Sequence, residues 1–246
     1  MKNIKPKEDN KESKKQQVEE MFDDISAFYD KANRFISLGM DRRWKKRLIK
    51  LLANENPQSI LDLATGTADL PLMMHTSGLR NIAGLDLSSG MLEIGKKRIE
   101  KEGLSDDIKL LQGDSENLPF SDNYFDAITV SYGLRNYENL SKGLTESLRV
   151  LKNNGVFVIL ETSVPQKFPF KQGYAFFSKV VMPFLGKIFS GNKNAYNYLS
   201  ESAMQFPCGN DLKEILIKAG FSDVIISPQF FGAASIYICK KQINND

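Results

Sequence analysis

The sequence predicts an α/β fold in which a mostly parallel sheet of seven strands carries helices on both faces. In the middle of the chain, short apolar runs alternate with longer amphipathic segments, a pattern typical of βαβ units. A turn of small residues around Gly66 follows the first run. The last two runs are separated by a stretch with Pro228 and Gly232, which favours an antiparallel pair at one edge of the sheet.

The predicted strands share apolar, often β-branched residues bounded by turn residues. They cover residues 59–64, 81–86, 107–112, 125–131, 155–161, 224–227 and 235–239. Apolar residues at helical spacing predict the helices that lie between them. These helices cover residues 70–76, 91–102, 140–151 and 212–219. The turn Asn153–Asn154–Gly155 is expected to open the fifth strand.

Two further segments flank this alternation. Residues 18–52 repeat apolar side chains at steps of three and four, which predicts an N-terminal helical cap. Residues 165–205 are rich in Phe, Tyr and Met without a strand pattern, and predict a helical insertion. Residues 1–17 mix charges of both signs and lack aromatics, so a mobile, disordered tail is expected there. The rest, residues 18–246, is predicted to form one domain.

The composition argues against several classes of function. The 246 residues include 33 Lys and Arg and 30 Asp and Glu, and a net charge of +3 disfavours a nucleic-acid partner. One histidine, His75, and two cysteines, Cys208 and Cys239, predict neither a metal site nor a disulfide framework. No apolar run approaches the roughly 20 residues of a membrane-spanning helix, and the charged N-terminus is unlike a signal peptide. A cytoplasmic protein is therefore expected.

The most informative segment is LDLATGTAD at 61–69, where a strand leads through small residues into a helix. Asp62 lies in the strand, and Gly66 and Thr67 lie in the turn. This geometry lets a ligand approach backbone amides at the N-terminus of a helix. The turn lacks the second and third glycines of G-x-G-x-x-G, which disfavours a nicotinamide or flavin dinucleotide and favours a smaller group.

Polar residues also end the next three strands. Asp86 ends the second strand, where an acidic residue can accept hydrogen bonds from both ribose hydroxyls. Asp114 and Ser115 follow the third strand and suit an adenine amine, and Ser131 closes the fourth. Because the carboxyl ends of parallel strands share one edge, these residues together predict an adenosyl ligand. Each aspartate taken alone is equally suited to cap a helix or a turn.

Three longer stretches resemble the menaquinone/ubiquinone biosynthesis C-methyltransferase family, within the Rossmann-like class I S-adenosylmethionine-dependent methyltransferases. They are YDKAN at 29–33 with SLGMDRRW at 37–44, SYGLRN at 131–136, and RVLKNNG at 149–155 with LETS at 160–163. The likeness extends over about residues 18–240. The chain departs from the family at Ala32, where Met is usual, at Asp41, where His is frequent, and at Asn153–Asn154, where Pro-Gly is usual.

The resemblance implies S-adenosylmethionine as methyl donor, without a metal. The implied reaction is C-methylation of the ring of reduced demethylmenaquinone, a prenylated quinol, in the last step of menaquinone biosynthesis. The cofactor-binding residues expected from the resemblance and from the turn are Asp62, Gly66, Thr67, Asp86, Asp114, Ser115 and Ser131.

A quinol becomes a carbon nucleophile when a ring hydroxyl loses its proton, and phenols titrate near about 10. We expect Arg135 to stabilise the developing quinolate and Asn136 to orient the ring or a water. Candidates for the base are Asp41, Asp30, Tyr29 and a water held by Arg135. As alternatives, Asp41 caps the helix that follows it, and Arg135 pairs with a surface acid.

A prenylated quinol is insoluble, so its tail needs shelter. The apolar side chains between Phe168 and Phe189 are expected either to pack as core or to line a channel and touch a membrane surface. In the second case Lys171, Lys179 and Lys187 would face anionic headgroups at the inner face of the cytoplasmic membrane. The oligomeric state is left open, with a homodimer as one alternative.

Other functions remain open. One is methylation of a different phenol or quinol, such as a ubiquinone precursor. From another class, the chain could serve as a non-catalytic adenosyl-binding subunit. A base-modifying amino-methyltransferase is disfavoured, because SYGL at 131–134 stands where those enzymes carry a Pro-Pro-Tyr type element. No motif sets the length of the prenyl chain.

Overall fold

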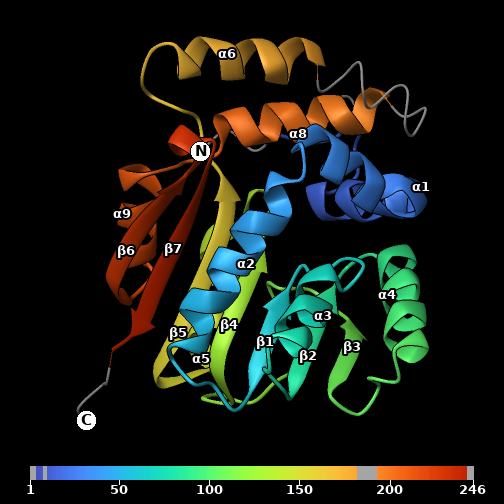
Figure 1. Cartoon of the computed structure of the whole chain (residues 1–246), viewed down its shortest axis with the longest axis vertical. Coiled ribbons are helices and arrows are strands. Elements are labelled where there is room, and N and C mark those ends of the chain that lie inside the picture. Colours follow the sequence, from blue (N-terminus) through green and yellow to red (C-terminus); the bar gives the residue numbers. More distant parts are fainter. Residues whose placement is uncertain (1–3, 8–9, 182–192, 243–246) are drawn as a thin grey trace.

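The computed structural model describes residues 4–7, 10–181 and 193–242. Figure 1 shows a central sheet with helices on both faces and a further group of helices above one end of its strands. In the described part of the chain the sheet has seven strands, in the order β3-β2-β1-β4-β5-β7-β6. Strands β1 to β5 pair in parallel, and β7 is antiparallel to β5 and β6. The predicted mostly parallel sheet with an antiparallel edge pair is confirmed.

The strands lie close to the predicted positions. They are β1 (Ile60–Leu63), β2 (Ile82–Asp86), β3 (Ile108–Gln112), β4 (Phe125–Ser131), β5 (Leu151–Thr162), β6 (Phe221–Gln229) and β7 (Ala234–Lys241). β5 begins before the predicted Asn153–Asn154–Gly155 turn, because Leu151 already pairs with Phe125 of β4 across an irregularity in the ladder. Pro228 lies within β6, which is the edge strand and therefore tolerates a missing N–H donor.

The helices complete the layers. They are α1 (Lys14–Ile36), α2 (Met40–Ala53), α3 (Asp69–Thr76), α4 (Ser89–Lys101), α5 (Leu140–Val150), α6 (Phe170–Phe176), α8 (Lys193–Gln205) and α9 (Asn210–Lys218). Three short segments are the 3-10 turns η1 (Leu134–Asn136) and η3 (Phe230–Gly232) and the π-helical η2 (Phe177–Val181). Residues 182–192 of the predicted insertion lie outside the described residues. Of the helices that the structure describes, none has both the length and the apolar content needed to cross a membrane.

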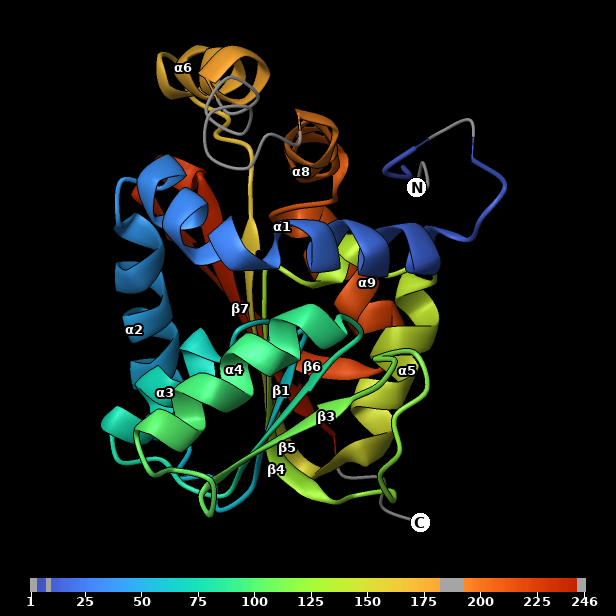
Figure 2. The same ribbon diagram turned by 90° about the vertical axis from the view of Figure 1, so that its right-hand side faces the viewer.

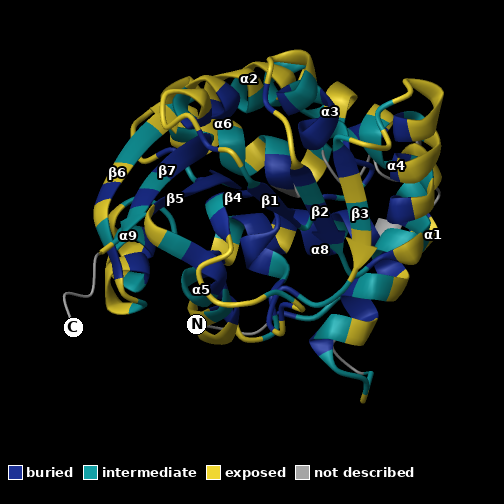
Figure 3. Ribbon diagram, turned by 90° about the horizontal axis from the view of Figure 1, so that it is seen from below, coloured by how far each residue is buried: buried dark blue, intermediate teal, exposed yellow. Residues whose placement is uncertain are grey.

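Alternation along the central strands supplies both faces of the core. Leu61 and Leu63 of β1 pack on one face with residues of α5 and α9, whereas Ile60 packs on the other with residues of α2 and α3. Successive side chains of a strand point to opposite faces, so a fully buried strand needs apolar residues throughout. Figure 3 shows the central strands in the dark blue of buried residues, with exposed residues outside them.

The N-terminal segment departs from the prediction. Helix α1 begins at Lys14, inside the expected mobile tail, where Ser13 and Gln16 form a capping box. Lys14 is 2% exposed, and its amine donates hydrogen bonds of 2.9 and 2.8 Å to the carbonyls of Arg135 and Tyr137. Ile4 is also buried, in an apolar cluster with α1. The expected disorder is wrong for these residues, because their partners lie far away along the chain.

Helix α1 lies across the carboxyl ends of the strands, above α4 (Figure 2). Asp23 accepts hydrogen bonds from the Ser88 hydroxyl at 2.5 Å and from the Gly90 amide at 2.9 Å. Both donors belong to the N-terminus of α4, where the helix dipole favours a negative charge. These contacts fasten α1 over the edge of the sheet at which open α/β folds bind their ligands.

Two helical glycines provide a matched test of the packing. A Cβ at Gly143 of α5 would stand 2.4 Å from two ring carbons of the buried Tyr137, whereas one at Gly173 of α6 would meet no described atom within 4 Å. Alanine favours a helix over glycine by about 1 kcal/mol, but overpacking costs about 1–3 kcal/mol. We therefore expect Gly143→Ala to lower the free energy of unfolding in urea and Gly173→Ala to leave it unchanged or raise it. Equal stability of the two variants would contradict the packing of Tyr137 on α5.

Candidate active site

A cavity of about 670 Å³ lies at the carboxyl ends of the parallel strands, beneath α1. All ten residues predicted for the site line it. They are Asp41, Asp62, Gly66, Thr67, Asp86, Asp114, Ser115, Ser131, Arg135 and Asn136. The chain proceeds from β1 to β2 and β3 on one side and from β4 to β5 on the other, so β1 and β4 flank the topological switch point. Ligands of open α/β sheets bind at this crevice.

The turn after β1 faces open space. Its residues Ala64, Gly66 and Ala68 have positive φ angles of 50°, 58° and 61°, a conformation that only glycine adopts without cost. The Gly66 amide donates to a carboxylate oxygen of Asp86 at 2.7 Å. No described atom lies within 4 Å of the place where a Cβ at Gly66 would stand. A ligand can therefore approach the backbone of this turn closely.

Asp86, at the end of β2, is held in place by backbone amides. Besides the Gly66 amide, the amide of Ser88 donates to its other carboxylate oxygen at 2.9 Å. Removal from bulk water raises the pKa of Asp86 to about 6, although these amides favour the charged form. The carboxylate still has lone pairs that can accept hydrogen bonds from a pair of vicinal hydroxyls.

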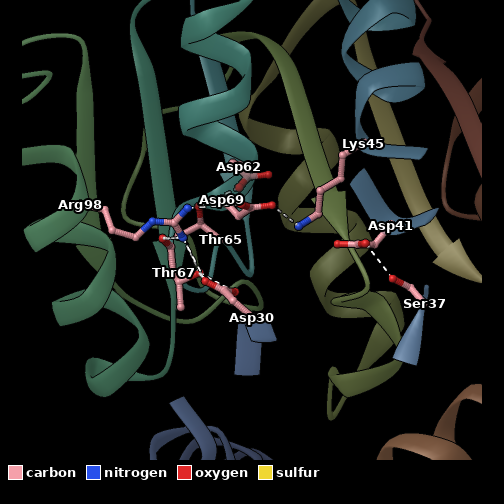
Figure 4. A network of polar contacts seen from close by, with 9 residues as sticks. All are labelled: Asp30, Ser37, Asp41, Lys45, Asp62, Thr65, Thr67, Asp69 and Arg98. Carbon is pink, nitrogen blue, oxygen red and sulfur yellow. Dashed lines mark hydrogen bonds and ion pairs between the residues drawn. The ribbon is translucent and has the colours of Figure 1, made fainter. Parts of the chain in front are cut away.

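Asp62 and Thr67 stabilise the turn through hydrogen bonds. The buried carboxylate of Asp62 accepts hydrogen bonds from the hydroxyls of Thr65 at 2.7 Å and Thr129 at 2.6 Å, and its burial raises its pKa to about 6. The Thr67 hydroxyl donates to Asp30 of α1 at 2.8 Å. Arg98 of α4 pairs with the same carboxylate at 3.0 Å, so α1, the turn and α4 meet there (Figure 4).

The adenine end of the predicted site follows β3. Asp114 accepts hydrogen bonds from the Lys15 amine and from the Glu116 amide, both at 2.8 Å. Ser115 beside it is 8% exposed. At the end of β4, the buried Ser131 hydroxyl finds no hydrogen-bond partner among the described residues. A buried polar group without a protein partner is suited to a ligand, so this edge fits an adenosyl group.

Arg135 reaches the cavity from η1, just past β4. The side chain is 7% exposed, and Nη1 donates to Glu161 at 2.5 Å and to the Tyr132 carbonyl at 2.8 Å. Glu161, at the end of β5, is fully buried, so the alternative in which Arg135 pairs with a surface acid is wrong. The Nε–H of Arg135 is buried and has no partner in the described part of the chain.

Asn136 connects the same turn to the insertion. Its side-chain oxygen accepts a hydrogen bond of 3.2 Å from the hydroxyl of Tyr198 on α8. Its amide nitrogen donates to the Tyr132 carbonyl at 3.4 Å. The insertion thus helps to hold the side chain that was expected to orient the acceptor.

The structure separates the candidates for the base. Asp30 is engaged by Thr67 and Arg98, on the cofactor side of the cavity. Burial raises the pKa of Tyr29, which keeps its hydroxyl protonated. Asp41 lies within the first turn of α2, after the cap residue Gly39, so it is not the helix cap. Its carboxylate accepts a hydrogen bond of 2.7 Å from the Ser37 hydroxyl and faces the cavity (Figure 4).

Two residues that line the cavity, Tyr132 and Lys45, were not predicted, nor was Glu161, which pairs with Arg135 behind it. The Tyr132 backbone has a φ of 60°, which is strained for a bulky residue, and its hydroxyl is buried without a partner among the described residues. Burial, and then the charge of Asp41, raise its pKa, so the hydroxyl is a hydrogen-bond donor. Lys45 pairs with Asp69 at 2.8 Å. Tyr132 and Glu161 belong to the motifs SYGLRN and LETS, so the sequence could have indicated both of them.

The sheet is doubly wound, and helix α1 covers the open turn after β1 and the acidic residue at the end of β2. This arrangement is typical of Rossmann-like methyltransferases. The chain belongs to the ubiE/COQ5 methyltransferase family, which it matches over residues 10–241. The predicted resemblance and enzyme class are confirmed, and S-adenosylmethionine is the methyl donor of this family.

Relatives of known activity cover almost the whole chain. The demethylmenaquinone methyltransferase of Bacteroides fragilis is 43% identical over 94% of this chain and 95% of its own length. That of Thermotoga maritima is 43% identical over 89% and 93%. Among solved structures, the [4+2]-cyclase SpnF superposes with a TM-score of 0.65 at 17% identity, over 94% of this chain and 97% of the other. That likeness concerns the fold, which a cyclase shares, so the reaction must be argued from the site.

The pKa of Asp86 predicts how cofactor binding depends on pH. Hydroxyl donors favour the ionised carboxylate, so affinity for S-adenosylmethionine should fall as the pH decreases through about 6. Loss of hydrogen bonds to a charged group costs about 1.5–3 kcal/mol, so Asp86→Asn should bind about 10- to 100-fold more weakly at pH 7.5. Titration calorimetry between pH 5 and 8 would measure both effects.

The matched control is the same pH series on Asp86→Asn, which should show no such dependence. Asp62 also has a pKa of about 6. If the variant retained the pH dependence of the wild type, Asp62 would be the titrating group and the role of Asp86 would be contradicted.

Proposed function

We propose that the chain methylates a ring carbon of demethylmenaquinol and thereby forms menaquinol in the last step of menaquinone biosynthesis. The observation that carries this proposal is that Arg135, a buried arginine, lines the cavity beside the cofactor turn and has an Nε–H without a hydrogen-bond partner among the described residues. The activity named for the relatives of Bacteroides fragilis and Thermotoga maritima supports the choice of substrate.

The residues at the strand ends are those proposed to hold the cofactor. When bound by the Gly66 turn, Asp86, Asp114, Ser115 and Ser131, S-adenosylmethionine supplies an electrophilic methyl group. Asp62 and Thr67 are proposed to hold the turn in shape through the hydrogen bonds described above. The protein's remaining task is to align a carbon nucleophile with that group and to exclude water.

Arg135 is proposed to make the quinol ring nucleophilic. Burial lowers and the charge of Glu161 raises the pKa of the guanidinium, and the net shift is upward. Arg135 therefore stays charged and acts as a donor, not as a base. Its charge stabilises a ring hydroxyl that has lost its proton, which raises the electron density of the ring carbons. Nη1 donates to Glu161 and to the Tyr132 carbonyl, and Nε–H is the donor proposed to bind the substrate.

Three neighbours are proposed to complete the reaction site. Tyr132 donates a hydrogen bond to a substrate oxygen, and Asn136 orients the ring or a water. Asp41 accepts the proton of the ring hydroxyl, either directly or through a water held by Arg135. The ring carbon that gains the methyl group then loses its hydrogen as a proton, and the ring oxygen regains one, which restores the aromatic quinol. No group of three His, Cys, Asp or Glu side chains in the described ranges is arranged to hold a metal ion, and metal-free chemistry stays a prediction.

The substrate's prenyl tail is proposed to leave the cavity on its apolar side, where Phe170, Phe177 and Leu38 line it. We further propose that the enzyme works in the cytoplasm, in peripheral contact with the inner face of the cytoplasmic membrane. The oligomeric state stays open, with a homodimer as one alternative. Methylation of another quinol, or a non-catalytic role as an adenosyl-binding subunit, are the competing functions.

A product assay distinguishes these functions. Incubation with methyl-labelled S-adenosylmethionine and chemically reduced demethylmenaquinone should place the label on a ring carbon of menaquinol. The oxidised quinone should give no product, because it has no hydroxyl to ionise. Cofactor binding without methylation of any quinol would indicate a non-catalytic subunit, and labelling of ubiquinone precursors alone would indicate a different substrate.

Arg135→Ala should lower kcat by about 10²–10³-fold, as loss of a preorganised charge does elsewhere, while the Kd for S-adenosylmethionine changes less than about threefold. That variant leaves the buried Glu161 carboxylate without its ion-pair partner, so the double variant Arg135→Ala/Glu161→Gln is measured alongside it. Arg80→Ala, at a surface arginine that pairs with Asp107, is the control and should retain full turnover. Recovery of turnover in the double variant would show that Arg135 is only structural.

A further inference from the structure

Large apolar side chains are exposed around the apolar side of the cavity, on three segments that are distant in sequence. They are Leu38 in the α1–α2 turn, Phe168 and Phe176 beside and at the end of α6, and Phe231 in η3, with exposed fractions of 80, 81, 63 and 64%. We name these four residues the apolar rim. Figure 2 shows the α1–α2 turn, η3 and α6 gathered at the upper left, and Figure 1 places them at the same end of the molecule.

The apolar rim is continuous with the cavity. Leu38, Phe170 and Phe230, one from each of the three segments, line the cavity itself. The rings of Phe170 and Phe231 stack at a centroid distance of 3.8 Å and an angle of 8°, which joins α6 to η3. A molecule that enters the cavity from this side therefore passes between exposed apolar side chains.

Two residues of the apolar rim, Leu38 and Phe231, and the cavity-lining Phe230 have unfavourable backbone conformations. Leu38, Phe230 and Phe231 have φ angles of 52°, 39° and 55°, in the left-handed region that bulky residues avoid. Strain of this kind persists where the surrounding structure imposes it and is concentrated at functional sites. Exposed apolar residues that gather at the edge of a cavity indicate an interaction site, whereas single exposed apolar residues do not.

The charge around the apolar rim is positive. Between Glu161 and Glu201 the sequence holds five lysines and no acidic residue, although the whole chain has 33 basic and 30 acidic residues. In the described part of this stretch, Lys167 and Lys171 are exposed next to the rim phenylalanines. Beyond Leu38, Arg42 and Arg43 at the start of α2 are exposed as well. Basic residues near an apolar surface attract it to anionic lipid headgroups.

We propose that the apolar rim docks on the surface of an anionic lipid bilayer and presents the cavity to the acyl-chain region. The proposal rests on the proposed function, because a prenylated quinol resides in the bilayer and must enter with its tail still partly in lipid. A second copy of the chain fits this face less well. A symmetric contact would bring the same patch together twice, and the positive charges of Lys167, Lys171, Arg42 and Arg43 on the two copies would repel one another.

Flotation with lipid vesicles tests the docking without cofactor or substrate. Wild-type protein should bind vesicles of phosphatidylcholine with one third phosphatidylglycerol at least about tenfold more than vesicles of phosphatidylcholine alone, and less at high salt. The rim variant Phe168→Ser/Phe176→Ser/Phe231→Ser should lose at least about tenfold of this binding. The charge variant Lys167→Glu/Lys171→Glu should lose the preference for anionic lipid.

The matched control is Ile217→Ser/Ile225→Ser, which removes exposed apolar side chains from α9 and β6 and should bind vesicles as the wild type does. Circular dichroism and S-adenosylmethionine binding would show that each variant is folded. The rim variant should methylate a short-tailed, water-soluble quinol at the wild-type rate and a long-tailed quinol in vesicles more slowly.

The docking surface would be overturned if wild-type protein did not bind anionic vesicles, or if the rim variant bound them equally well. It would also be overturned if the rim variant changed only the sedimentation coefficient, since the patch would then be a contact between copies. Failure to methylate the short-tailed quinol would instead refute the proposed function, because flotation decides the docking surface independently.

Discussion

The buried ion pair between Arg135 and Glu161 is the interaction on which the reaction side of the cavity depends. It joins η1, which follows β4, to the end of β5, and neither side chain is more than 7% exposed. Two charges removed from water are costly, and in other proteins an apolar pair of similar volume is often as stable as a buried ion pair or more so. The pair therefore contributes position more than stability. It holds a permanent positive charge against the cavity, and it aligns the turn that also carries Tyr132 and Asn136.

Helix α1 connects that charge to the cofactor side. Lys14 holds the carbonyls of Arg135 and Tyr137, Asp23 binds the N-terminus of α4, and Asp30 binds Thr67 in the cofactor turn. One helix is thus fastened to three loops that come from different strands. Because each loop contributes residues to the cavity, a shift of α1 would alter both the cofactor side and the reaction side together.

The cavity is divided according to polarity. Asp86, Asp114, Ser115 and Ser131 line it at the strand ends, where parallel strands bring their C-termini together. On the other side Phe170, Phe177 and Phe230 of α6, η2 and η3 and Leu38 of the α1–α2 turn line it. This arrangement suits the proposed reaction, in which a methyl group passes from a polar nucleoside to a quinol with a lipid tail. It also accounts for the insertion, which adds an apolar wall that the sheet and its crossover helices do not provide.

The order of strands and helices, and the gathering of the site residues that lie in or after β1 to β4, could be predicted from the sequence; Asp41, on α2, came from the resemblance. Both follow from local properties: the period of apolar residues defines each element, and parallel pairing places the residues after β1, β2, β3 and β4 side by side. Which residues contact one another across the fold was decided by the tertiary structure alone. The burial of Lys14 in an apparent tail, the pairing of Arg135 with Glu161 and the exposure of Phe231 each depend on residues distant in sequence. Local patterns carry no information on such contacts, because the free energy of a buried charge or an exposed ring depends on what the folded chain places beside it.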